Sequence, residues 1–187
     1  YVCSRKIIGG EANPLTIINV KDKTNPLIVK EMTIPDLATS TNLCWSLDVS
    51  GAYVYLGLGT LGSNSSTESF RIVDVSNPSN PVVKGGRDIG TNSDPNLALS
   101  EEYTAFNYVK VLGTRLYATT WWNDFLIIDV ASSTDPEIIS KTSIGDNSPL
   151  TFDGPLTFDF RGNYVSIGYA PILSSYSTST DYFRIFK

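Results

Sequence analysis

A 55-residue internal repeat dominates this chain of 187 residues. Three segments, which begin at Leu15, Phe70 and Phe125, align without a gap over 20 residues and start 55 residues apart. A fourth start, FRIFK, begins at Phe183, 58 residues after Phe125. A period near 50 residues with several strand patterns per unit is typical of a β-propeller, in which each unit forms one blade. The repeat therefore predicts an all-β fold.

Each unit is predicted to hold four strands, a to d, from the centre of the propeller outward. In the clearest unit they cover Leu43–Gly51, Ala52–Thr60, Phe70–Ser76 and Pro81–Ile89. We expect units over residues 1–34, 42–90, 105–145 and 155–187, which gives a propeller segment of about 3.5 four-stranded blades.

The two end units are expected to be incomplete. Tyr1–Arg5 already matches Tyr53–Gly57 of strand b, so the first unit lacks strand a, and the last unit lacks strand d. Because about four blades are the usual minimum, we expect upstream sequence or another chain to close the ring. Upstream sequence is the preferred reading, since the chain opens without Met inside a predicted strand.

Strand c carries apolar residues on both faces. Phe70 and Ile72 face one way and Val73 the other, while FLIIDV at Phe125 leaves no polar face. Such runs indicate a strand buried on both faces, as in a blade between two neighbours.

A turn with its own chemistry follows strand c in each of the three aligned copies. An Asn or Asp ends the strand and a Pro opens strand d seven residues later, at Asn19 and Pro26, Asp74 and Pro81, and Asp129 and Pro136. Asn and Asp side chains accept hydrogen bonds from turn N–H groups, and Pro fixes φ. We therefore interpret these carboxylates as turn residues and not as metal ligands.

The segment FRIVDVSNPSNP, together with FLIIDV, LTIINV and AYVYLG, resembles the LVIVD repeat family. The resemblance covers nearly the whole chain copy by copy, and APILSSYSTSTD at residues 170–181 departs from it. It implies propeller repeats like those of bacterial and archaeal surface and secreted proteins. It carries over no catalytic residue.

Charge and composition exclude several functions. The net charge is −5 with no basic cluster, which disfavours nucleic acid, and no apolar run of 18 residues could insert into a membrane. The chain has no His, so it cannot form a Ser-His-Asp or Cys-His arrangement. We predict a non-enzymatic surface or assembly module, located extracellularly, on a cell surface or on a virion, with no cofactor and no metal.

The competing interpretation is a carbohydrate-active enzyme or lectin that uses acids and aromatic residues at the propeller rim. Its candidate carboxylates lie in the long connections between units, at Asp94, Glu101, Asp146 and Asp153. A glycosidase needs two such groups about 5–9.5 Å apart. Solvated loop acids are the simpler explanation.

Trp121, Trp122 and Asp124 mark the predicted ligand-binding site. They form a short hairpin between strands b and c of the third unit. Adjacent strand residues point to opposite faces, so one indole is expected to stay exposed and contact a glycan or a partner protein. The alternative is that both indoles pack between blades. Asn64 begins an Asn-Ser-Ser glycosylation sequon.

Cys3 and Cys44 are the only cysteines. They form no CxxC motif, so a zinc site is not expected. We predict two buried free thiols, and a disulfide between neighbouring blades is the alternative.

Overall fold

The computed structural model describes residues 1–8, 11–34, 42–60, 69–88, 106–120, 124–144, 154–170 and 183–186. Every secondary-structure element in these residues is a β-strand, and the strands form four separate sheets. The first sheet holds β1 (Val2–Ile8), β2 (Glu11–Asn19) and β3 (Leu27–Met32), and the second holds β4 (Asn42–Ser50), β5 (Tyr53–Thr60), β6 (Ser69–Asp74) and β7 (Val82–Asp88). The third holds β8 (Phe106–Leu112), β9 (Arg115–Thr120), β10 (Asp124–Asp129) and β11 (Glu137–Ser143), and the fourth holds β12 (Gly154–Arg161), β13 (Tyr164–Ala170) and β14 (Phe183–Phe186).

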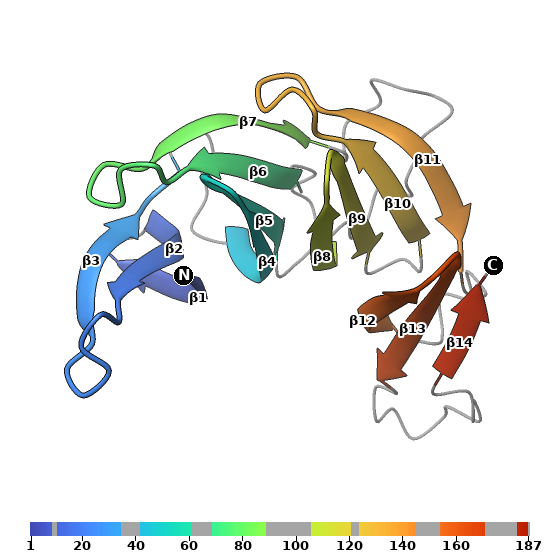
Figure 1. The fold of residues 1–187 in the computed structure, drawn as a ribbon, viewed down its shortest axis with the longest axis horizontal. Helices are drawn as coiled ribbons and strands as arrows, with labels where there is room; N and C mark the ends of the chain where they lie inside the picture. The colour runs from blue at the N-terminus through green and yellow to red at the C-terminus, as the bar shows by residue number, and fades with distance from the viewer. Residues whose placement is uncertain are drawn as a thin grey trace.

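We call these sheets blades 1 to 4. Each strand pairs antiparallel with the next strand along the chain, so every blade is a simple meander. The blades follow one another along an arch, with β4, β8 and β12 on its concave side and β3, β7 and β11 on its convex side (Figure 1). The predicted all-β propeller segment is confirmed.

Strands c and d of blades 1 to 3 pair with the same irregularity. The register shifts between Ile17 and Ile18, between Ile72 and Val73, and between Ile127 and Ile128. These positions coincide in the gapless alignment, so one extra residue of strand d bulges at the same point in each blade. The sequence repeat is therefore also a repeat of backbone geometry.

The register of β1 differs from the sequence expectation by two residues. Val2 pairs with Thr16 of β2. Arg71 occupies the same repeat position in blade 2 as Thr16, and it pairs with Leu56. Val2 therefore corresponds to Leu56 and not to Val54. Because strand side chains alternate between faces, a shift of two residues keeps each one on its own face, and the apolar pattern could not distinguish the two registers.

The core is divided among the three joints between blades. One cluster joins Leu15 and Ile17 of blade 1 to Leu56 and Val75 of blade 2. Two further clusters lie between blades 2 and 3 and between blades 3 and 4. Strand c is buried on both faces, as predicted, since Phe70, Ile72 and Val73 are fully buried.

Candidate functional site

The inner strands β4, β8 and β12 place one charged side chain each at the same repeat position. Asp48, Lys110 and Asp159 all stand three residues before the glycine that turns strand a into strand b. These turn glycines, Gly51, Gly113 and Gly162, have φ values of 58°, 61° and 59°, a conformation that favours glycine. The common turn therefore fixes the three charges at one level of the concave side.

These charges link neighbouring blades. The Val111 N–H donates to Asp48 Oδ2 at 2.7 Å, from blade 3 to blade 2. Lys110 Nζ lies 2.5 Å from Asp159 Oδ1, from blade 3 to blade 4. The hydrogen bond to Asp159 raises the pKa of Lys110, and the same bond lowers the pKa of the Asp159 carboxyl. Both groups therefore stay ionised at neutral pH, and the three charged residues link the inner strands of blades 2, 3 and 4.

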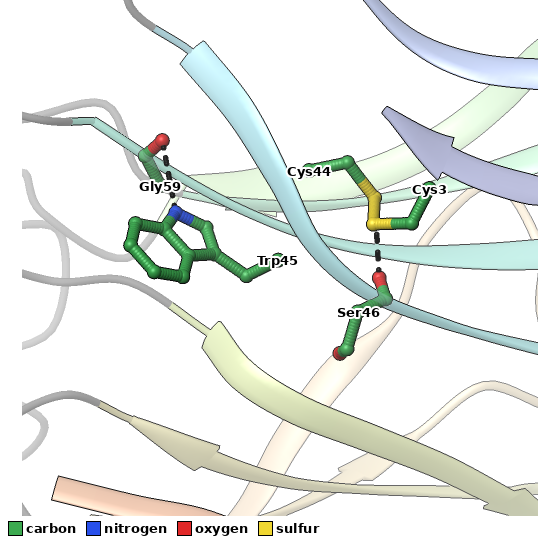
Figure 2. The surroundings of a disulfide bond; sticks show 5 residues. All are labelled: Cys3, Cys44, Trp45, Ser46 and Gly59. Carbon is green, nitrogen blue, oxygen red and sulfur yellow. Dashed lines mark hydrogen bonds between the residues drawn. A yellow bond between two sulfur atoms is a disulfide. The ribbon is translucent and has the colours of Figure 1, made fainter. Parts of the chain in front are cut away.

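A disulfide joins Cys3 of β1 to Cys44 of β4, with the two Cα atoms 5.4 Å apart. The prediction of two free thiols was wrong, and the alternative of a bond between neighbouring blades is correct. A bulge at Trp45 breaks the pairing of β4 with β5 between Cys44 and Ser46. Trp45 Nε1–H donates to the Gly59 carbonyl at 3.3 Å, and Cys44 Sγ lies 3.3 Å from the Ser46 carbonyl oxygen (Figure 2).

The sequence could not decide between thiols and a disulfide because the two cysteines are 41 residues apart. Cys3 stands on strand b of one blade and Cys44 on strand a of the next. Only the packing of β1 against β4 brings their Cα atoms within the 4.4–6.8 Å that a disulfide requires.

Asp124 is the one residue of the predicted ligand site that lies in the described part of the chain. It opens β10 and is only 5% exposed. Its carboxylate pairs with Lys141 Nζ at 3.3 Å, and its N–H donates to Thr120 Oγ1 at 3.2 Å. Burial raises the pKa of the Asp124 carboxyl, and the opposing effect of Lys141 is smaller. The carboxylate thus forms an ion pair with Lys141 inside blade 3.

The other predicted site residues lie outside the described residues. They are Trp121 and Trp122, the sequon residue Asn64, and the loop acids Asp94, Glu101, Asp146 and Asp153. Their roles stay predictions.

The turns between strands c and d have the predicted chemistry. In blades 1, 2 and 3, the side chains of Asn19, Asp74 and Asp129 each accept the N–H of the residue two positions later, at 2.9 Å. Hydrogen bonds from the Ser76 side chain and then its N–H lower the pKa of the Asp74 carboxyl, and the Ala131 N–H lowers the pKa of the Asp129 carboxyl. Among the described residues, no group of three His, Cys, Asp or Glu side chains could hold a metal ion.

A cavity of about 410 Å³ lies between blades 3 and 4. Tyr117 and Phe125 line it from blade 3, and Phe160 and Tyr164 line it from blade 4. Tyr117 and Phe160 pack edge to face with ring centroids 4.6 Å apart. Aromatic walls with a few polar groups, here Thr142 and Asn163, suit the apolar face of a ligand. Sequence reasoning missed this cavity because its walls come from two separate blades.

The fold and these contacts can be compared with known proteins. The LVIVD repeat model matches residues 44–89 and 107–142, which cover blade 2 and most of blade 3. No curated protein is significantly similar to the chain. In the described part of the chain, no helix has the length and apolar character needed to cross a membrane. With two matched repeats, each folded as a four-stranded antiparallel blade, the chain belongs to the LVIVD repeat family.

Proposed function

We propose that the chain is a non-enzymatic module of an extracellular surface or assembly protein, built from LVIVD repeats. The disulfide between Cys3 and Cys44 carries this proposal. Disulfides persist in oxidising compartments, such as the cell surface and the bacterial periplasm, and are rare where thioredoxin and glutathione keep thiols reduced. The bond joins two blades and buries Cys44, so it is part of the packed structure.

The proposed activity is binding of a protein or a glycan at the propeller rim. The hairpin that carries Trp121 and Trp122 connects β9 to β10, the two strands that supply Tyr117 and Phe125 to the aromatic cavity. Large amphipathic rings provide contact area at a small entropic cost, which supports a binding surface near this end of blade 3.

The state of the two cysteines in native material tests the location. Protein from its natural source is alkylated under denaturing conditions, before and after reduction, and weighed by intact mass spectrometry. We expect no alkylation before reduction and two alkylated cysteines after it, with the protein in the envelope or secreted fraction. Two thiols that alkylate without reduction would contradict an oxidising location.

A polysaccharide panel distinguishes binding from turnover. We expect retention on a glycan or a partner protein without product formation, and weaker retention for Trp121→Ala or Trp122→Ala. Hydrolysis that is lost on alanine substitution of Asp94, Glu101, Asp146 or Asp153 would instead establish the carbohydrate-active enzyme.

A further inference from the structure

A groove of about 550 Å³ lies at the joint between blades 1 and 2, where β3 meets the start of β7. Both strands are on the convex side of the arch (Figure 1). Met32 and Pro81 are buried in the groove, whereas Lys30 and Val82 line it with exposed side chains. Residues 30–33 and 80–83 form it, so both of its walls belong to blades that the structure describes.

The same repeat positions are in close contact at the next joint. Gly85 of β7 corresponds to Lys30, and a Cβ on Gly85 would meet the Ser133 carbonyl oxygen at 2.4 Å. Because Lys30 carries a Cβ, the turn of blade 2 cannot approach β3 as closely as the turn of blade 3 approaches β7. The groove therefore follows from a side chain at a position where the next blade has glycine.

An arginine reaches across the joint between blades 2 and 3 at this level. Arg87 Nη1–H of β7 donates to the Pro136 carbonyl at 3.2 Å. In the gapless alignment, Arg87 corresponds to Met32, and Pro136 corresponds to Pro81. Met32 has no N–H group in its side chain, so it cannot donate such a hydrogen bond to Pro81.

Pro81 and Pro136 have the same backbone setting. Each is buried and directly precedes strand d. The turn before each one is held by an Asp side chain, Asp74 or Asp129, which accepts the N–H two positions later at 2.9 Å. In both blades, the residue after the proline pairs with that Asp. The carbonyl that accepts from an arginine in one joint thus has a direct counterpart in the other.

We propose that the groove binds an arginine side chain of a partner protein, whose guanidinium takes the place that the Arg87 guanidinium has in the next joint. Pro81 supplies the carbonyl acceptor, and Glu31, which also lines the groove, supplies negative charge. Met32 and Val82 offer apolar surface to the methylene stem. The net charge of −5 favours the approach of a cationic partner. This surface is separate from the rim of blade 3.

Met32 allows a direct test because it is the only methionine of the chain. A ¹³C-methyl methionine label therefore gives one NMR signal, inside the groove. The intact, disulfide-bonded chain is titrated with acetyl-arginine amide, and we expect a saturable shift of this signal. Acetyl-citrulline amide has nearly the same shape and no charge. It should bind about fivefold or more weakly, since hydrogen bonds from charged donors are stronger.

Charge variants that keep Met32 locate the binding. Lys30 places a positive charge beside the groove, so Lys30→Glu should lower the dissociation constant of acetyl-arginine amide by about two- to fivefold. Lys23→Glu, in the turn of blade 1, changes the net charge equally and should act much less. A shift that does not saturate, equal affinity for the citrulline amide, or equal effects of the two variants would overturn the proposal.

Discussion

At the residue scale, the bond between Cys3 and Cys44 ties strands that no backbone pairing connects, because β1 and β4 belong to different sheets. Asp48 and the Lys110–Asp159 pair perform the same task at the other joints without a covalent bond. In the described residues, the first joint thus has a covalent link, and these polar contacts at the other joints contribute a small net energy.

We expect the disulfide to stabilise the protein considerably. Its two ends are 41 residues apart, and closing a loop of this length in the unfolded chain contributes about 2–4 kcal/mol. The double variant Cys3→Ser/Cys44→Ser should lose about that much free energy of unfolding in a urea titration. Wild type with a reducing agent is the matched control and should reach the same midpoint. An unchanged midpoint after verified reduction would contradict this role.

Asp124 should make stability depend on pH. Burial raises the pKa of its carboxyl above the ordinary value of 3.8, so the folded protein binds the proton more tightly than the unfolded chain. As pH rises from 3.8 through the raised pKa, wild type should lose stability relative to Asp124→Asn, with no further change above that range. Urea titrations of both proteins at several pH values measure the difference.

Asp74→Asn is the control with the opposite sign. The hydrogen bonds from Ser76 lower the pKa of Asp74, so wild type should gain stability relative to this variant as pH rises towards 3.8. Equal trends for the two variants would show that burial of Asp124 does not govern its protonation.

At the element scale, strand d of one blade serves as the platform for the turn of the next blade. Gly85 of β7 lies against the Ser133 and Thr134 backbone, where no side chain fits. The glycine is therefore required by the close approach of two elements and not by its own backbone conformation.

We expect Gly85→Ala to push the turn between β10 and β11 off β7. Its Cβ meets backbone atoms that cannot rotate away, and overpacking of this kind costs about 1–3 kcal/mol. Ser140→Ala, at the equivalent exposed position of β11, should change the free energy of unfolding by less than about 0.5 kcal/mol. Equal effects in urea titrations would refute the docking of the turn.

Sequence reasoning predicted the elements well where the repeat constrained them. The apolar pattern predicts strand c of the three aligned copies, near Leu15, Phe70 and Phe125. Turn chemistry predicts the turns that follow Asn19, Asp74 and Asp129. It could not predict the disulfide or the aromatic cavity, because both depend on how separate blades pack. It also placed β1 two residues off, since period-two alternation is blind to that shift.

At the scale of the whole molecule, the hydrophobic clusters of the described residues each join one blade to the next, as in other repeat arrays. Local stability should therefore vary from joint to joint. Among the described residues, the joint between blades 3 and 4 is the one interrupted by the cavity of about 410 Å³.

We expect blade 4 to open first. Native-state hydrogen exchange should show faster exchange for amides of β13 than for those of β5 and β9, because a cavity interrupts the packing between blades 3 and 4. Phe158→Ala should widen this difference, since Phe158 packs against both Tyr108 and Phe125. Uniform protection across all four blades would show that the array unfolds as one unit.

The disulfide between blades 1 and 2 also determines which part of the chain a pulling force can extend. If the two ends are pulled apart, the segment between Cys3 and Cys44 cannot extend until the disulfide breaks. At about 3.5 Å per residue, this segment corresponds to about 140 Å of extended chain. Stretching is then confined to the residues after Cys44, which include β5 to β7 of blade 2. Mechanical load would therefore extend the later blades while β1 to β3 of blade 1 stay enclosed by the bond.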